Sequence, residues 1–229
     1  MDALIIYGGW DGHEPTQVAN VLKEQLVKSG FGVKMRKRLN ALDNLDFLAA
    51  FDLIVLEWTM GRTRKSERIG NLCKVVREHG VGFAGLHGGA GDAFRAETDY
   101  QFMVGGQFVA HPDNILDFRV NIVDRTDPVT NGLTDFNIHS EQYYMHVDPS
   151  NHVLATTTFE STGVTIPVAW KRTYGKGRVF YLSIGHIAAD LDVPEVLTLM
   201  TRGMIWAAEG KTVAAANTCV EQKCTDAPR

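Results

Sequence analysis

The residue in this chain with the clearest setting for chemistry is His87. The stretch Val81-Gly-Phe-Ala-Gly-Leu-His-Gly-Gly-Ala90 is typical of a buried strand that runs directly into a glycine-rich turn. A glycine-flanked turn of this kind indicates a nucleophile elbow, which lifts one side chain above the end of a strand. Here the lifted side chain is a histidine, which cannot form the acyl-enzyme of a serine or cysteine. It can bind a metal or move a proton.

Two further histidines follow apolar runs or lie in stiffened loops. His186 comes directly after Gly185 at the end of a predicted strand, and His111 precedes Pro112 in a glycine-containing loop. Ligands of an open parallel sheet bind beyond the carboxyl ends of its strands. We therefore expect His87 and His186 to meet at that edge of the sheet, with His111 beside them.

The segment His139-Ser-Glu-Gln-Tyr-Tyr-Met-His146 is dense in polar and aromatic residues. If it is extended, the alternation of strand side chains places His139, Glu141 and Tyr143 on one face. We expect Glu141 to serve as a metal ligand or a general base.

Three histidines and one carboxylate are a suitable ligand set for a divalent cation. Imidazole and carboxylate ligands in an open site are typical of catalytic zinc, and manganese is the alternative. We predict the metal ligands to be His87, His111, His186 and Glu141, and the catalytic residues to be His87, Glu141 and His186. The sequence has no H-x-x-x-H or C-x-x-C pattern, so the site exists only if the fold assembles it.

The predicted substrate contacts also follow strand ends: they are Trp10, Asp11, His13, Trp58 and Tyr143. Tryptophan and tyrosine rings at these positions either stack against a sugar ring or pack into the core, and the sequence leaves both interpretations open. The loop Gly8-Gly-Trp-Asp-Gly12 lacks both G-x-G-x-x-G and G-K-[ST], which argues against a nucleotide cofactor.

The elements that must position these residues alternate between strand and helix in the first half of the chain. Such alternation predicts an α/β fold, with a mainly parallel sheet covered by helices on both faces. The expected strands cover residues 3–7, 31–37, 53–56 and 81–86, and the expected helices cover 15–29 and 64–79.

The second half predicts added antiparallel strands with few helices between them. These strands cover 116–123, 152–158, 166–172 and 178–184, and Tyr174-Gly-Lys-Gly177 forms a hairpin loop between the last two. A final helix is expected over 190–208. We assign residues 1–210 to one domain and 211–229 to a mobile C-terminal tail, because the apolar period is lost there.

Composition excludes several classes of function. The 229 residues carry a net charge of −4, so the basic field needed for nucleic-acid binding is missing. No apolar run approaches the roughly 18 residues of a membrane span, and the N-terminus lacks the basic region of a signal peptide. The cysteines, Cys73, Cys219 and Cys224, form no disulfide framework. These features favour a cytoplasmic protein with neither a nucleic-acid nor a membrane partner.

Several blocks together resemble the ThuA-like, or trehalose-utilisation, family from about residue 3 to 208. They are Gly8-Gly-Trp-Asp-Gly-His-Glu14, Gly85-Leu-His-Gly-Gly-Ala-Gly-Asp-Ala-Phe94, Phe102-Met-Val-Gly-Gly-Gln-Phe-Val-Ala-His-Pro112, His139-Ser-Glu-Gln-Tyr-Tyr144, and Gly175-Lys-Gly-Arg-Val-Phe-Tyr181 with Gly185-His186. The resemblance implies a flavodoxin-like fold of the class I glutamine amidotransferase type. It also implies a role in the catabolism of trehalose and its keto derivatives.

The chain departs from an amidotransferase at the decisive positions. His87 stands where such an enzyme has its cysteine nucleophile, and His186 stands where it has its base. Glutamine hydrolysis through a thioester is therefore excluded as a function, because no thiolate is present to attack. Two adjacent imidazoles favour metal binding instead.

We expect a metal-dependent enzyme that isomerises or cleaves a sugar, such as a keto-disaccharide. The alternative is a sugar-binding or regulatory module without chemistry. A weaker alternative is a metal-free hydrolase with Asp11 and Glu141 as its carboxylate pair. The expected partner is a small sugar, and a homo-oligomer follows only from the base rate for soluble proteins.

Overall fold

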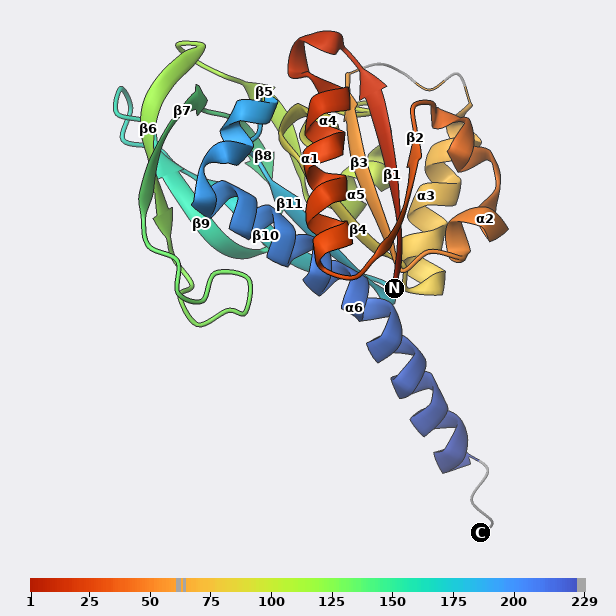
Figure 1. Cartoon of the computed structure of the whole chain (residues 1–229). Coiled ribbons are helices and arrows are strands. Elements are labelled where there is room, and N and C mark those ends of the chain that lie inside the picture. The colour runs from red at the N-terminus through yellow and green to blue at the C-terminus, as the bar shows by residue number, and fades with distance from the viewer. Residues whose placement is uncertain (61–62, 64, 226–229) are drawn as a thin grey trace.

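One nine-stranded sheet forms the centre of the protein (Figure 1), as seen in a computed structural model of the chain. The structure describes the backbone of residues 1–60, 63 and 65–225, with side chains up to residue 216. The strands are β1 (Asp2–Gly9), β2 (Gly32–Arg36), β3 (Leu53–Thr59), β4 (Gly82–Leu86), β6 (Ile115–Ile122), β7 (Phe136–Glu141), β9 (His152–Thr158), β10 (Thr165–Tyr174) and β11 (Gly177–Leu182). Their order in the sheet is β2-β1-β3-β4-β11-β10-β9-β6-β7.

The strands β2, β1, β3, β4 and β11 are parallel, and they form the half of the sheet that carries the histidines. Leu53, Ile54, Val55 and Leu56 are all completely buried, as the continuous apolar run of a strand covered on both faces predicts. Because these strands run in one direction, the loops after β1, β3, β4 and β11 emerge at one edge of the sheet.

The remaining strands are antiparallel additions. The turn from Tyr174 to Gly177 joins β10 to β11 as predicted, and β9, β6 and β7 continue the sheet outward. A separate two-stranded sheet pairs β5 (Gly106–Ala110) with β8 (Tyr144–Val147), and the sequence did not predict either strand. Together these segments place Glu141 and His111 near the parallel half.

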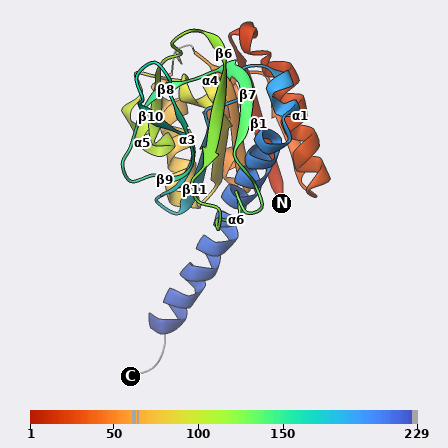
Figure 2. The same cartoon turned by 90° about the vertical axis from the view of Figure 1, so that its left-hand side faces the viewer.

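Helices cover both faces of the sheet (Figure 2). On one face, α1 (Pro15–Lys28) and α6 (Pro194–Thr225) pack against the buried side chains that β1, β3, β4 and β11 direct toward them. On the other face lie α2 (Leu45–Ala49), α3 (Ser66–His79) and α5 (Thr98–Val104). Short elements complete the chain: α4 (His87–Gly91), η1 (Asp11–His13), η2 (Leu39–Asp43) and η3 (Ala188–Asp192). This arrangement is the mixed α/β architecture that the sequence predicts.

The last helix extends beyond its predicted end. α6 continues to Thr225, where the sequence led us to expect a tail from residue 211, and its end projects from the body of the molecule (Figure 1). Loss of the apolar period does not end the helix, because the alanine-rich segment 212–216 has high helix propensity. Lys211 fastens the helix at this point by donating to the carbonyl oxygens of Ala49 and Phe51 at 2.8 and 2.7 Å.

Within the described part of the chain, no helix is both long and apolar enough to cross a membrane.

Candidate functional site

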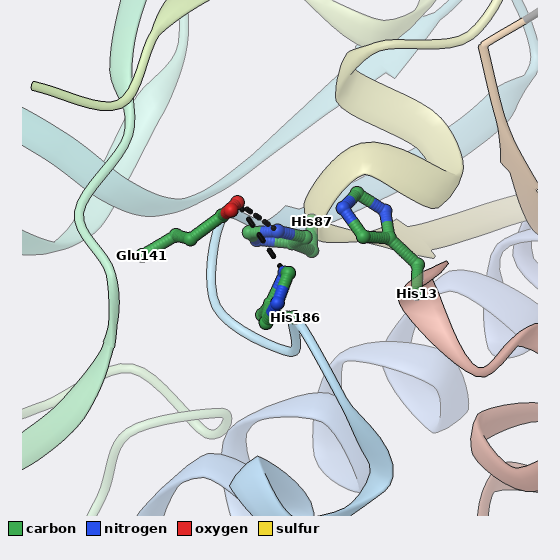
Figure 3. Close-up of side chains that lie close together, drawn as sticks. All are labelled: His13, His87, Glu141 and His186. Atoms are coloured by element: carbon green, nitrogen blue, oxygen red, sulfur yellow. Dashed lines mark hydrogen bonds and ion pairs between the residues drawn. The ribbon is translucent and has the colours of Figure 1, made fainter. Parts of the chain in front are cut away.

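Four side chains from distant parts of the sequence meet at the carboxyl edge of the parallel strands (Figure 3). His13 ends η1 after β1, His87 begins α4 after β4, and His186 follows β11. Glu141 is the last residue of β7 and approaches from the antiparallel half. Each of the four offers one potential ligand atom, and these atoms all lie within 4.8 Å of one another. We call this group the histidine cluster.

His87 is held rigidly in a conformation that is uncommon for its residue type. Its φ of +42° lies in the left-handed region, as expected for the lifted residue of an elbow. The side chain is 1% exposed, and Nδ1 lies 2.9 Å from the carbonyl oxygen of Ser183. Because a carbonyl only accepts, Nδ1 carries the proton and donates it.

The other ring nitrogen of His87 faces Glu141. Nε2 lies 3.1 Å from Glu141 Oε2. With Nδ1 protonated, a neutral His87 directs the lone pair of Nε2 at a carboxylate oxygen, which also only accepts. This contact is favourable only when a cation or a further proton lies between the two atoms.

His186 approaches the same carboxylate oxygen. Its Nδ1 lies 3.4 Å from Glu141 Oε2 and is buried without a hydrogen-bond partner. The backbone is fixed by Asp190, whose Oδ2 accepts from the His186 N–H at 2.8 Å. The same oxygen accepts from Ser140 Oγ at 2.5 Å, so Asp190 links the loop of His186 to the strand that carries Glu141.

His13 completes the cluster from the side of β1. The residue is 4% exposed, and its Nδ1 lies 2.8 Å from Thr59 Oγ1 at the end of β3. Its ring centroid is 4.8 Å from that of His87 and 4.9 Å from that of His186. A Cβ atom at Gly88 would lie 2.5 Å from His13 Cε1, so this approach requires glycine at position 88.

Burial and mutual repulsion keep two of the rings neutral. Desolvation lowers the pKa of His13 to about 3, assisted by the charges that His87 and His186 would carry. Desolvation also lowers the pKa of His87, and it outweighs the opposing contact with Glu141. Neutral imidazole is the form that binds a metal.

The other two groups favour their charged forms. Contact with Glu141 raises the pKa of His186. Burial acts to raise the pKa of Glu141, but its contacts with His186 and His87, and the positive charge that these rings can carry, bring that pKa below its usual range. The cluster therefore presents an ionised carboxylate surrounded by imidazoles.

The composition of the cluster differs from the predicted ligand set at one position. It contains His13, which we predicted as a substrate contact, and it does not contain His111. His111 Nε2 lies 3.8 Å from Glu141 Oε1, the oxygen turned away from His87 and His186. The His111 side chain is 38% exposed, so it lies between the cluster and solvent.

The predicted aromatic contacts occupy different environments. Tyr143 is buried and stacks on His87 with ring centroids 3.9 Å apart, while Trp10 is 49% exposed beside His13. Trp58 packs with the core and against Gly8. Asp11 is exposed, so its pairing with the buried Glu141 in a metal-free hydrolase stays a prediction.

His139 and Glu141 lie on the same face of β7, because the pairing of β7 with β6 continues through Glu141 without a register shift. Their surroundings differ, because Glu141 is buried within the histidine cluster whereas His139 is exposed. His139 points to the surface and pairs with Asp117 at 3.0 Å.

Sequence reasoning missed the residues that support the cluster. Thr59, Ser183 and Asp190 contact His13, His87 and His186 respectively. Thr59 is the last residue of β3 and Ser183 directly follows β11. A position at or after a strand end is the same feature that predicts the histidines as site residues. Asp190 had no comparable signal, because a carboxylate four residues beyond His186 is ordinary in a loop.

A second group of potential ligands is already neutralised. Asp124, Asp127 and His152 lie close together, but the ammonium group of Lys171 pairs with Asp127. His152 Nε2 is 2.8 Å from Asp124 Oδ2. The carboxylates of this group are therefore already engaged, Asp127 by a buried contact with Lys171 and Asp124 by His152.

Comparison with known proteins places the chain in a family. The sequence profile described as trehalose utilisation (ThuA) matches residues 2–207. The protein belongs to the ThuA family. This membership implies involvement in trehalose utilisation. No curated protein matches the sequence.

Solved structures show the same fold. A putative ThuA-like protein from Parabacteroides merdae has a TM-score of 0.74 and 22% identity, covering 92% of this chain and 90% of that one. A putative ThuA-like protein from Bacteroides uniformis has a TM-score of 0.75 and 19% identity, covering 90% and 91%. The glutaminase domain of Trypanosoma brucei CTPS has a TM-score of 0.52 and 10% identity, covering 95% of this chain and 94% of that one. The fold is therefore also of the glutamine amidotransferase type.

Proposed function

We propose that this ThuA-family protein is a metal-dependent enzyme that isomerises or cleaves a neutral sugar, with a keto-disaccharide as the substrate class. The observation that carries the proposal is the contact between His87 Nε2 and Glu141 Oε2 at 3.1 Å, in which two acceptors face each other. A divalent cation bound by both atoms would convert this repulsion into coordination. Membership of the trehalose-utilisation family supports a sugar substrate.

The donor set fits a zinc or manganese ion. Three imidazoles and a carboxylate suit these metals, and the buried His186 Nδ1 makes no hydrogen bond among the described residues, although Glu141 Oε2 lies 3.4 Å away. Bond lengths of about 2.0–2.2 Å bring donor atoms slightly closer than the observed 4.8 Å limit, so binding requires a small contraction of the cluster. The hydrogen bond that His87 Nδ1 donates to the Ser183 carbonyl orients His87, and the contact with Thr59 Oγ1 orients His13, as supporting residues do for metal-bound imidazoles.

A bound divalent metal would polarise a sugar carbonyl or hydroxyl pair and acidify the adjacent C–H bond. His13, His87, His186 and Glu141 Oε2 would hold it. Glu141 Oε1 and His111 would then move one proton from a sugar carbon to the adjacent carbon and one proton between the oxygen atoms on those carbons, which isomerises the sugar without an external oxidant. The exposure of His111 lets this proton exchange with solvent. Tyr143 and Trp10 would orient the ring.

A sugar-binding module is the second candidate. It is supported by Trp10, which exposes about half of its surface beside the cluster and offers a face to a sugar ring. A pure binding protein would bind the sugar without metal and return it unchanged. ¹H NMR of trehalose and its keto derivatives, incubated with metal-loaded and chelator-treated protein, separates the two functions.

The first test is elemental analysis of the untagged full chain purified without chelator. We expect about one zinc or manganese ion per chain. His87→Ala, His13→Ala and His186→Ala should lose it, because each removes a ligand. His139→Ala is the matched control, because this histidine is exposed and pairs only with Asp117 among the described residues. Metal-free wild-type protein, even after metal is supplied again, would overturn the proposal.

The variant His111→Ala separates the two possible ligand sets. It should retain the metal and lose most turnover, because His111 lies outside the histidine cluster but beside Glu141. Loss of metal in His111→Ala with retention in His13→Ala would instead support the set predicted from sequence.

A further inference from the structure

A pocket of about 600 Å³ opens near the same edge of the molecule, between the loop after β3 and the loop after α4. Its volume lies in the range of small-molecule sites. Met60 and Phe94 contribute apolar surface, and Thr63, Asp92, Arg95 and Glu97 contribute polar groups. The pocket thus combines an apolar wall with several hydrogen-bonding groups.

The pocket contains a buried charged side chain held in a defined position. Asp92 is 6% exposed, and the Arg95 guanidinium pairs with its Oδ1. Arg95 also lies over the ring of Phe108, with Cζ 5.0 Å from the centroid. A carboxylate beside a guanidinium group offers hydrogen-bond acceptors and donors side by side, which neighbouring hydroxyl groups of one ligand can use together.

Backbone strain occurs at this pocket as well as at the histidine cluster. Among the described residues other than glycine, asparagine and aspartate, positive φ values occur at Glu14, Met60, His87 and Phe94. His87 belongs to the cluster and Glu14 follows His13, whereas Met60 and Phe94 line the pocket. Strained residues of this kind persist where function requires their position.

Two aromatic rings, Phe108 and Tyr143, connect Arg95 of the pocket to His87 of the cluster. Arg95 contacts Phe108, Phe108 lies 4.4 Å from Tyr143, and Tyr143 lies 3.9 Å from His87 between ring centroids. Burial, followed by the charges of Tyr181, Glu141 and Asp92, raises the pKa of Tyr143. Tyr143 therefore interacts electrostatically both with Glu141 of the cluster and with Asp92 of the pocket.

The charges of the described lining favour a neutral ligand. Asp92 and Glu97 together outweigh Arg95, and Asp92 already neutralises the guanidinium group. A phosphate or carboxylate would have to displace that pairing, whereas sugar hydroxyls can accept from Arg95 and donate to Asp92 while the pair stays intact.

We propose that this pocket is a subsite for a neutral polyhydroxylated ring, and that it holds the sugar unit of a disaccharide that does not react at the histidine cluster. This inference rests on the proposed function, because it assigns the second ring of the same substrate. Asp92 and Arg95 grip neighbouring hydroxyl groups, and Met60 packs against the apolar face of the ring.

The test is calorimetric titration of the full chain with trehalose, maltose and sucrose, in metal-loaded and chelator-treated samples. Asp92→Asn and Arg95→Met should weaken binding of the preferred disaccharide tenfold or more and leave metal content unchanged. Arg125→Met is the matched control, because it removes an exposed arginine paired with Asp135. Arg95 is itself exposed, so Arg95→Met stays informative even if Asp92→Asn fails to fold.

Three results would overturn the inference. They are no binding of any of the three disaccharides, equal binding by the Arg95→Met variant, and tighter binding of glucose 6-phosphate than of glucose, which would indicate an anion site. Failure of the proposed function looks different. In that case the chain lacks metal while Arg95→Met still weakens disaccharide binding.

Discussion

At the scale of single residues, the two nitrogen atoms of His87 have separate roles. Nδ1 donates to Ser183, and this hydrogen bond leaves Nε2 as the atom that faces Glu141. A serine or cysteine at this position would attack a substrate carbon, whereas a neutral, buried imidazole with a fixed tautomer is suited to coordination. One side-chain change on an amidotransferase-type fold thus alters the chemistry that its elbow can perform.

Asp190 is expected to set the geometry of the cluster without touching the metal. Asp190→Ala removes the shared acceptor of Ser140 Oγ and the His186 N–H, so metal affinity should fall by about 10–100-fold. Asp190→Asn keeps an oxygen that can accept both bonds, so it should lose less. Metal titration with a competing chelator measures both variants. Equal affinity in Asp190→Ala and wild type would show that the link is unnecessary.

At the scale of elements, glycines let the short helix α4 pack closely against its neighbours. A Cβ at Gly88 would collide with His13, and one at Gly89 would lie 2.1 Å from Glu57 Oε2. β3 delivers that glutamate beneath α4, where it is 1% exposed. The glycine-rich turn therefore serves close packing as well as the lifted conformation of His87.

The variant Gly88→Ala tests this packing, and Gly70→Ala is its control. The Cβ at position 88 would lie 2.5 Å from His13 Cε1, so Gly88→Ala should lower both stability and metal content. Nothing lies within 4 Å of a Cβ at Gly70 in α3, so Gly70→Ala should raise the free energy of unfolding by about 0.5–1 kcal/mol. Urea denaturation measures both changes. Equal unfolding free energies for Gly88→Ala and Gly70→Ala would contradict close packing at position 88.

Lys211 attaches α6 to the segment that joins α2 to β3. Lys211 donates to two carbonyl oxygens and lies 3.8 Å from Asp52 Oδ1. Lys211→Met should therefore cost about 1–2 kcal/mol of unfolding free energy, because it leaves these partly buried carbonyls unpaired. Lys23→Met, on the exposed side of α1, should change stability by less than about 0.5 kcal/mol. Equal urea midpoints for the two variants would contradict this role.

At the scale of the whole molecule, stability should depend on pH through Glu57. Desolvation raises the pKa of this buried carboxyl group well above 4.5, and Oε2 has no hydrogen-bond partner. The folded state therefore retains a proton that the unfolded state loses, so stability should decline as pH rises above about 4.5. The decline should continue until the folded group ionises as well.

The variant Glu57→Gln removes this titration. The unfolding free energy of Glu57→Gln should not show the decline above about pH 4.5 that ionisation of Glu57 causes in the wild type. It should therefore exceed the wild-type value at neutral pH, even if the variant and the wild type have equal unfolding free energies near pH 4.5. Denaturant unfolding at a series of pH values gives the comparison. Parallel pH curves for the variant and wild type would rule out Glu57 as the source.

The sequence by itself determined the parallel half of the sheet and the strand ends that carry His13, His87 and His186. Apolar runs bounded by glycine indicate strands that are buried on both faces. A strand that packs between two layers of helices needs apolar residues at successive positions, and this pattern is visible in a short stretch of sequence. The turn residues Tyr174 to Gly177 located the hairpin between β10 and β11, and the polar and aromatic segment from His139 to His146 indicated Glu141. These features depend on residues that are close in the chain.

Only the tertiary structure decided which side chains meet. His13 rather than His111 joins the cluster, because the relative positions of the β1 loop and the β5 segment depend on packing between distant elements. The pairing of β5 with β8, the burial of Glu141 at the end of β7, and the role of Asp190 are likewise set by contacts across the fold. Such contacts leave no periodic pattern in the sequence, because each joins residues with no fixed spacing along the chain.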